Sequence, residues 1–268
     1  MKGAVLLIIC LMIVCCKPHG KDHFLQDNSV QLASPRLIAS NKIIDSAAVL
    51  QTELAMDGIS IFYTDDGGEP TSEGSELYKE PISVLRPGTY KFKAFHPDWK
   101  PSETAVITFV KMGQKVDSVI WNEALNQQYS GRGPRALVNH KKAGVNYTDK
   151  EWLGFDAPAV MTCIFDQQLN ISSVDIGYLN HPGAWIFPPG SVQIHTSEDG
   201  LDFRPHGKND LPQPQGMSDA AQQTFNIPIS KKVKAMKLEF KNVTRIPVWH
   251  EGKGQKGWMF MDEIIFNK

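Results

Sequence analysis

The feature that most constrains the fold is the spacing of short apolar segments along the chain. Segments rich in β-branched and aromatic residues recur about every dozen residues and stop at clusters of Gly, Pro, Asp and Asn. Residues 89–95 are typical, because Tyr90 and Phe92 alternate with Lys91 and Lys93. No long stretch with a 3.6-residue helical period lies between these segments. The pattern predicts an all-β protein made of β-sandwiches.

The expected strands fall into two groups. The first group is expected at residues 59–64, 81–85, 89–95 and 105–110. The second group is expected at residues 160–165, 171–179, 191–196, 233–240 and 258–266. Apolar and charged side chains alternate within the segment 233–240, which predicts an antiparallel strand with one face in the core. The length of the chain allows two ordinary domains.

Three short motifs stand in the first group: residues 61–71 (Ile-Phe-Tyr-Thr-Asp-Asp-Gly-Gly-Glu-Pro-Thr), Leu77-Tyr78 with Pro81-Ile82, and residues 88–94. On these motifs, residues 33–112 resemble the immunoglobulin-like domain at the C-terminus of chitobiases and β-hexosaminidases. The resemblance implies a β-sandwich that acts as a spacer. Asp66 is an extra acidic residue ahead of the glycine, and we expect its side chain to bond local backbone amides.

The second group carries five further motifs: residues 136–139 (Ala-Leu-Val-Asn), 152–155 (Trp-Leu-Gly-Phe), 171–174, 187–203 and 249–264. On these motifs, residues 129–268 resemble the coagulation factor V/VIII type C, or discoidin-like, domain. The closing motif is similar to the version attached to hexosaminidases of gut-type bacteria. The resemblance implies a discoidin-like β-sandwich jelly roll, in a superfamily that binds glycans, lipids or proteins. Residues 113–128 are expected to be a linker.

The pattern of the first residues predicts a targeting signal rather than a folded element. Lys2 precedes an apolar run over residues 3–14 that is too short to span a bilayer, and a Cys-Cys pair ending at Cys16 follows. This arrangement resembles a bacterial lipoprotein signal, with residues 1–15 removed and Cys16 lipidated; an ordinary secretory signal is the alternative. Residues 16–32 would then be a polar tether. The protein would be lipid-anchored to a membrane of the cell envelope, on its periplasmic or surface face.

Charge and cysteine usage exclude several classes of function. The chain has 28 Lys and Arg against 29 Asp and Glu, so it lacks the excess of positive charge that is typical of a nucleic-acid-binding protein. Beyond residue 16 the only cysteine is Cys163, so an internal disulfide or a zinc cluster is excluded. Cys163 lies in an apolar segment, and we expect a buried, unreactive thiol.

One pair of residues raises the question of catalysis. Asp262 and Glu263 are adjacent, like the paired carboxylates of substrate-assisted hexosaminidases. They fall inside the expected strand 258–266, where successive side chains point to opposite faces, so they should not flank one substrate. The sequence contains no nucleophile elbow, phosphate loop or paired-histidine zinc signature. The sequence therefore predicts a protein without catalytic activity.

The resemblance to discoidin-like domains also implies one structural Ca²⁺, held between an early loop and a glutamate near the last strand. In this chain the corresponding residues are Asn139, Thr148 and Glu263. Calcium takes about six to eight oxygen ligands, many of them backbone carbonyls. The family's acidic residue is replaced by Asn139, which removes a charge. The alternative is that Glu263 pairs with a surface lysine.

Aromatic and planar polar residues in loops are the candidate ligand contacts: Trp249, Trp185, His250, His181, Arg245 and Trp258. A sugar packs its apolar face on an aromatic ring, and its hydroxyl groups take hydrogen bonds from His or Arg. Trp185 and Trp249 stand near glycine and proline, which favours an exposed loop. Trp258 adjoins a strand, and core packing is its alternative role.

Together these features predict a non-catalytic carbohydrate-binding lipoprotein. Its discoidin-like domain would recognise a galactose- or N-acetylhexosamine-type glycan through loops. Two alternatives stay open at this point. One is a protein-docking or structural component of an envelope complex, and the other is the accessory C-terminal half of a glycoside hydrolase.

Overall fold

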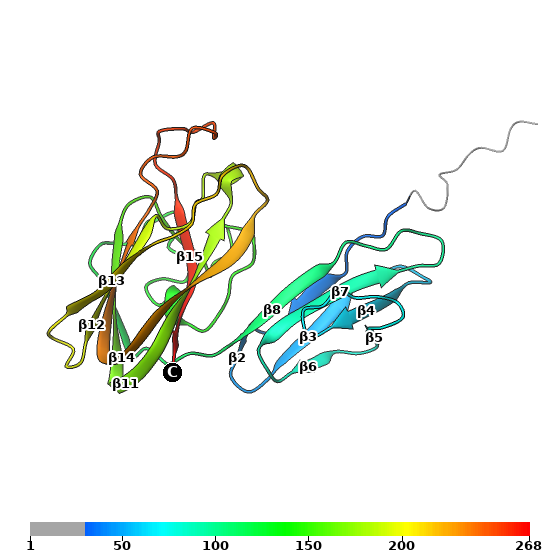
Figure 1. The fold of residues 1–268 in the computed structure, drawn as a ribbon, viewed down its shortest axis with the longest axis horizontal. Helices are drawn as coiled ribbons and strands as arrows, with labels where there is room; N and C mark the ends of the chain where they lie inside the picture. The colour runs from blue at the N-terminus through cyan, green and yellow to red at the C-terminus, as the bar shows by residue number, and fades with distance from the viewer. Residues whose placement is uncertain (1–29) are drawn as a thin grey trace, which may run out of the picture.

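The computed structural model describes residues 30–268, and apart from short 3-10 turns every regular element in this range is a β-strand. The prediction of an all-β protein is confirmed. No helix among these residues is long and apolar enough to cross a membrane. Residues 1–29 lie outside the described part, so the signal at residues 1–15 and the lipidation of Cys16 stay predictions. Two separate sets of strands follow one another along the chain (Figure 1).

The first sandwich, strands β1 to β8, consists of two small sheets. One sheet has the order β1 (Arg36–Ala39), β3 (Ala48–Glu53) and β6 (Ile82–Val84). The other has the order β2 (Ile43–Ile44), β8 (Ala105–Lys111), β7 (Gly88–Phe95), β4 (Ser60–Thr64) and β5 (Glu76–Leu77). Only β2 and β8 pair in parallel among these strands. The sheets enclose a core of their own.

Alternating side chains fill this core. Along β3 the residues are buried and exposed in turn, with Leu50 fully buried. On β7, Phe92 is fully buried and stacks on Tyr63, with 5.3 Å between the ring centroids. In the turn after β4, the Asp66 carboxylate accepts a hydrogen bond from the Gly68 backbone N–H at 2.8 Å. Asp66 therefore stabilises the turn, as the sequence predicts.

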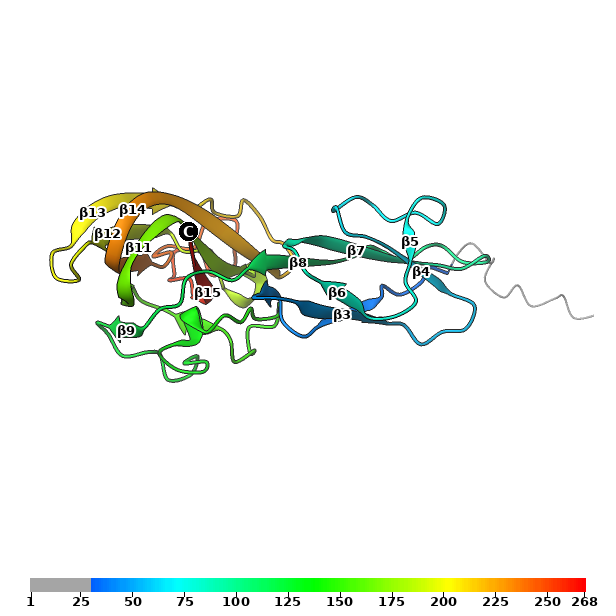
Figure 2. The ribbon, with the colours of Figure 1, turned by 90° about the horizontal axis from the view of Figure 1, so that it is seen from below.

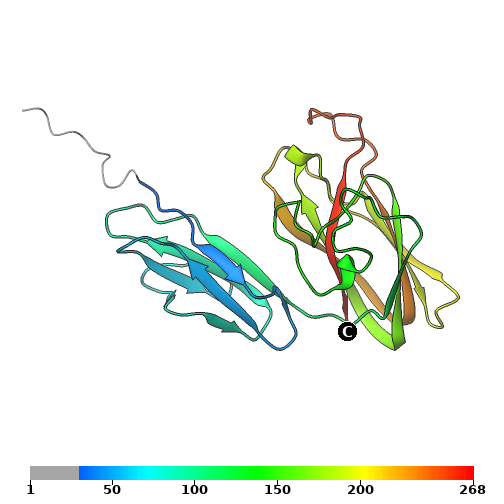
Figure 3. The same ribbon diagram turned by 180° about the vertical axis from the view of Figure 1, so that it is seen from behind.

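The second sandwich, strands β9 to β15, is larger. Its strands have the order β10 (Leu153–Phe155), β15 (Met259–Asn267), β11 (Ala159–Asn180), β14 (Ala221–Lys241), β12 (Ser191–Ser197) and β13 (Arg204–Asp210). A further strand, β9 (Ser118–Trp121), pairs with β11. In Figure 2, β9 and β13 lie at opposite sides of this sandwich. The loop between β14 and β15 extends from the end opposite the C-terminus (Figure 3).

Two long strands organise the second sandwich. β11 pairs antiparallel with β14 over almost its whole length, while its first part also pairs with β9 and its second part with β15. The sequence pattern predicts two strands, at residues 160–165 and 171–179, where the structure has the single strand β11. The register shifts between Ile164 and Leu169, and this irregularity is what interrupts the apolar pattern.

The structure corrects two expected boundaries. The expected linker, residues 113–128, contains β9, and Val116 ahead of it is buried in the core of the second sandwich. The end of the expected tether, residues 16–32, belongs to the first sandwich, because Leu32 is buried and donates its backbone N–H to the Lys100 carbonyl at 3.0 Å. Both segments are polar enough to suggest a linker, yet β9 pairs with β11, and Gln31 forms an isolated β-bridge with Lys100.

The two sandwiches contact each other directly at Lys42 and at Gly113. Lys42 of the first sandwich donates to the Ala143 carbonyl at 3.0 Å and to the Gln222 side chain at 3.3 Å. Burial lowers the pKa of Lys42 below its usual value. A Cβ atom on Gly113 would lie 2.7 Å from the Ile265 side chain, so only glycine allows the chain to pass this closely.

Cys163 gives a first testable consequence of the core. Its side chain is fully buried on β11, and burial raises the pKa of the thiol far above its usual value. Because the thiolate is the reactive form, we expect no alkylation by iodoacetamide at pH 8 until the second sandwich unfolds. Labelling followed by mass spectrometry across a urea titration checks this. Labelling of Cys163 in the absence of urea would contradict its placement.

Candidate functional site

Four segments that are distant in sequence meet at an aromatic hollow, which we call the cup. It is lined by Tyr129, Tyr147, Ala184, Trp185, Ile186, Trp258 and Phe260, and its volume is about 160 Å³. The cup lies on a small core of its own, formed around Trp152 and Phe260. Its four outer rings are half-buried, so each has one part fixed in the protein and another open to solvent.

The rings of the cup are held against one another. Tyr129 packs edge-on against Trp258 at 5.1 Å and against Phe260 at 4.9 Å between ring centroids. Tyr147 packs edge-on against Phe260 at 6.1 Å. Edge-to-face pairs at these separations are favourable and restrict ring rotation. The cup is therefore formed before any ligand arrives.

Trp185 forms one wall through an unusual backbone conformation. It ends the short 3-10 turn η3 (Pro182–Ala184) with φ of 62°, in the left-handed region. Its indole N–H donates to the Glu251 carboxylate at 3.2 Å. A Cβ atom on Gly252 would lie 2.9 Å from the Trp185 ring, so the loop between β14 and β15 needs glycine there. These contacts orient the ring toward the cup.

A polar groove continues from the cup. It has a volume of about 220 Å³, shares Tyr129 and Tyr147 with the cup, and includes Gln128, Thr148 and Lys150. The Gln128 side chain donates to the Tyr129 hydroxyl at 3.1 Å, which leaves the hydroxyl hydrogen free to donate elsewhere. Aromatic faces and hydrogen-bonding groups therefore lie next to each other.

The structure brings together some of the predicted ligand contacts and not others. Trp185 and Trp258 both line the cup. His181 lies beside it, with its ring 6.2 Å from the Tyr147 ring, but its Nδ1 atom is buried. Trp249 and Arg245 are on the loop between β14 and β15, which we call the outer loop, and neither lines the cup.

The prediction for His250 is corrected. Its side chain is only 3% exposed, and its Nε2 atom donates to the Pro182 carbonyl at 2.8 Å. Its Nδ1 atom accepts from the Gly252 backbone N–H at 2.9 Å. Both ring nitrogens form hydrogen bonds within the protein, so His250 holds the outer loop against the η3 turn. Neither nitrogen is available to a ligand.

The side chains of the three predicted calcium ligands do not converge, although the Asn139 backbone contacts Glu263. Asn139 donates to Glu151 at 2.7 Å, while its side-chain oxygen accepts from the Lys141 backbone N–H. Thr148 is exposed and bonds Asn146. No cluster of three or more acidic, His or Cys side chains suited to a metal occurs among residues 30–268.

Glu263 is the third of these predicted ligands, and its surroundings do not suit a cation. Its carboxylate is buried and accepts from the backbone N–H groups of Asn139 at 3.2 Å and His140 at 3.1 Å. Burial raises its pKa to about 8, and both of its oxygens already accept hydrogen bonds from backbone N–H groups. The donors present therefore do not fit calcium, and calcium binding stays a prediction from the resemblance alone.

Asp262, the neighbour of Glu263, is held by a lysine. Its fully buried carboxylate pairs with Lys142 at 2.8 Å and accepts from the Ala143 backbone N–H at 3.1 Å. One loop, residues 139–143, donates to the carboxylates of both Asp262 and Glu263. Neither carboxylate lines the cup.

This arrangement predicts that calcium is not needed for folding. We expect the melting temperature to change by less than about 1 °C between excess calcium and EDTA, because Lys142 already neutralises Asp262. A structural ion at about 100 times its dissociation constant would add about 2.7 kcal/mol of stability. Differential scanning fluorimetry would detect that gain as a rise of several degrees, which would contradict the expectation.

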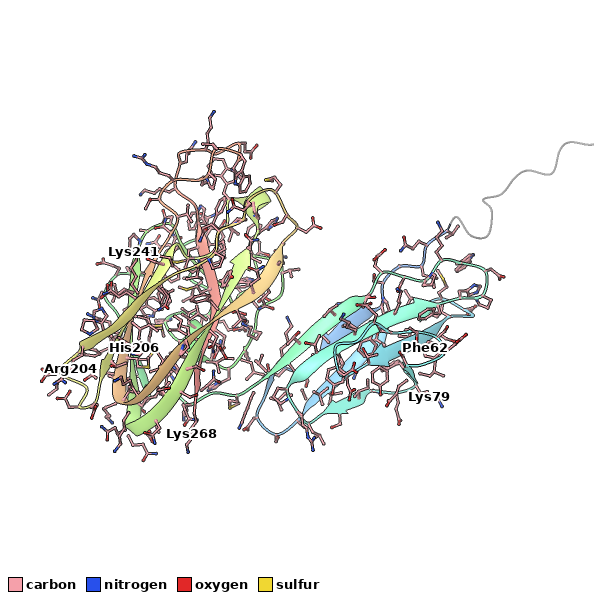
Figure 4. The ribbon with its side chains drawn as sticks, in the orientation of Figure 1. Phe62, Lys79, Arg204, His206, Lys241 and Lys268 are labelled. Atoms are coloured by element: carbon pink, nitrogen blue, oxygen red, sulfur yellow. The ribbon has the colours of Figure 1, made fainter. Side chains whose placement is uncertain are left out.

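A larger hollow beside β13 is a poor alternative site. It measures about 650 Å³ and is lined by charged groups of both signs, among them Asp199, Asp202 and Lys231. Arg204 and His206, both on β13, line it as well and lie far from the outer loop (Figure 4). Its lining includes no Trp, Tyr or Phe side chain. The cup is therefore the better-formed site.

The comparisons with known proteins agree with the fold of the first sandwich. The family model for the chitobiase/beta-hexosaminidase C-terminal domain matches residues 41–108. The resemblance from which a sandwich was predicted for this part is thereby confirmed. No curated protein matches the chain.

Similar solved structures are carbohydrate-binding modules and a chitobiase domain. A pectin-binding carbohydrate-binding module shares 16% identity, covering 58% of this chain and 92% of its own, with a TM-score of 0.37. A CBM32 module from Clostridium perfringens, in complex with GalNAc-β-1,3-galactose, shares 14% identity over 56% of this chain and 94% of its own, with a TM-score of 0.39. The C-terminal domain of a chitobiase from Bacteroides fragilis shares 15% identity over 57% and 91%, with a TM-score of 0.35. At these scores the likeness does not assign a ligand to this chain.

Proposed function

We propose that this protein is a non-catalytic carbohydrate-binding protein and that the cup holds one sugar residue of a glycan. The observation that carries this proposal is the convergence of four half-buried aromatic rings from four segments on one small hollow. Aromatic rings with one open face suit the apolar face of a pyranose. Pockets for drug-sized ligands measure about 300–1,000 Å³, so a hollow of about 160 Å³ suits a single sugar.

The polar groove supports a glycan rather than an isolated sugar. Its hydrogen-bonding side chains adjoin the aromatic wall, where they can reach the hydroxyl fringe of a second residue. The resemblance to discoidin-like domains supports galactose- or N-acetylhexosamine-terminated glycans as the first ligands to test. One small site binds weakly, so the proposed lipid anchor at Cys16 would add avidity by clustering copies on a membrane.

The absence of catalysis is part of the proposal. The adjacent carboxylates of Asp262 and Glu263 are buried and hydrogen-bonded to the protein, so they are not available to a substrate in the cup. Their contacts explain their presence without a reaction. A binding role, with the first sandwich as a spacer, accounts for both halves of the described chain.

A glycan array tests the proposal. The protein should bind a subset of neutral glycans with galactose or N-acetylhexosamine at their ends, equally well with calcium and with EDTA. A folded, β-rich protein that binds no glycan on the array would contradict the proposal and favour docking to a protein partner.

A further inference from the structure

A second aromatic hollow lies on the same sandwich, outside the cup. It measures about 490 Å³ and is lined by residues of the segment 121–126, at the end of β9, and by residues 155–159, which lead into β11. Its acidic lining residues are Glu123 and Asp156, and no Lys or Arg lines it. The strand β9 lies at the opposite side of the sandwich from β13 (Figure 2).

The aromatic wall of this second hollow is fixed in place. The Trp121 ring stacks on Phe155, with 5.5 Å between centroids and 27° between ring planes. Its indole N–H donates to the Pro134 carbonyl at 2.9 Å, and its backbone pairs with Met161 of β11. The ring is half-buried, so it offers a preformed apolar surface at the edge of the sheet.

The polar rim of the hollow is acidic. Asn126 donates to one oxygen of the Asp156 carboxylate at 3.4 Å, and Glu123 and Asp156 are both exposed. Neither carboxylate takes part in an ion pair with any residue in the range 30–268. Within that range, two carboxylates without a cation partner therefore line the same hollow as an aromatic ring. This combination suits a ligand with an apolar face and a positive charge.

We propose that this hollow is a second carbohydrate site, and that it takes a sugar bearing a free, protonated amine. The apolar face of the sugar packs on Trp121, and its ammonium group lies between Glu123 and Asp156. Uronic acids and sulfated sugars are repelled by the same two carboxylates. The second hollow shares no lining residue with the cup, so a test of ligand binding at one site is independent of a test at the other.

Calorimetric titration with a glucosamine trimer tests the proposal. In the Trp185→Ala variant, which lacks one wall of the cup, we expect binding that weakens at least about tenfold for the N-acetylated trimer and falls with added salt. The double variant Glu123→Gln/Asp156→Asn should lose about tenfold or more in affinity. Both positions are exposed, so these near-isosteric changes leave the fold intact, whereas Trp121→Ala would also disturb core packing.

Two controls make the result decisive. Glu198→Gln changes an exposed carboxylate elsewhere on the sandwich and should leave binding of the glucosamine trimer unchanged, as should Trp185→Ala in the cup. The proposal is overturned if the N-acetylated trimer binds the Trp185→Ala variant as tightly as the glucosamine trimer does, if trilysine binds as tightly as the glucosamine trimer, or if the glucosamine trimer does not bind.

Discussion

Replacing Trp185 by alanine should reduce glycan binding at the cup by at least about tenfold, which corresponds to about 1.4 kcal/mol. The substitution removes one aromatic wall of a hollow of about 160 Å³ and leaves the other three outer rings in place. A stacking contact of this kind contributes beyond the area it buries. Affinity chromatography on an immobilised glycan from the array, followed by calorimetry, measures the change.

Trp249→Ala is the matched control for this prediction. Trp249 is also a half-buried tryptophan near η3, but it packs against Phe187 and His250 and does not line the cup. We expect its removal to change affinity by less than about twofold, a difference below about 0.5 kcal/mol. Full binding by Trp185→Ala together with lost binding by Trp249→Ala would move the site to the outer loop.

Replacing Lys142 by methionine should destabilise the second sandwich by about 3 kcal/mol. The Lys142 and Asp262 side chains are 9% and 0% exposed, so the change leaves a buried carboxylate without its cation. Asp262 also accepts from Gln222, which in turn accepts from Lys42 of the first sandwich. Urea unfolding followed by tryptophan fluorescence measures the loss.

The neighbouring lysine provides the control for this substitution. Lys141 is exposed, and Lys141→Met should change stability by less than about 0.5 kcal/mol. The double variant Lys142→Met/Asp262→Asn removes both charges and should recover part of the loss. If Lys142→Met unfolds at the same urea concentration as the unaltered protein, the pair does not stabilise this loop.

The same pair links stability to the proposed function. Lys142 begins the loop that carries Tyr147 into the cup, and its neighbour Ala143 is anchored to Asp262. A loop freed from this anchor no longer fixes the Tyr147 ring. We therefore expect Lys142→Met to weaken glycan binding as well as stability.

Much of the fold could be predicted because local patterns and tertiary structure agree. Strand β7 alternates apolar and polar residues, and β4 and β8 are rich in β-branched and aromatic residues, so their positions follow from the sequence. The first half of β14 could not be found in this way. Residues 221–232 are mostly polar and include Pro228, and they are strand only because they pair with β11.

The cup could be predicted only in part. The sequence predicts Trp185 and Trp258 as ligand contacts because Trp185 stands beside glycine and proline and Trp258 stands at the end of a glycine-rich loop. Tyr129 and Tyr147 lie in segments without a strand pattern, and only the packing of distant segments brings them to Trp258 and Phe260. His250 looks like a loop ligand in the sequence, but its partner Pro182 is 68 residues away. Such long-range hydrogen bonds leave no local signal.

The indole N–H signals of the six tryptophans offer the most direct test of the cup. In a ¹H–¹⁵N NMR titration with a neutral glycan that binds on the array, the signals of Trp185 and Trp258 should shift, while those of Trp99, Trp121 and Trp249 should stay in place. Shifts confined to Trp249, or no shift at Trp185 and Trp258 under saturating glycan, would contradict the proposal that the cup is the binding site.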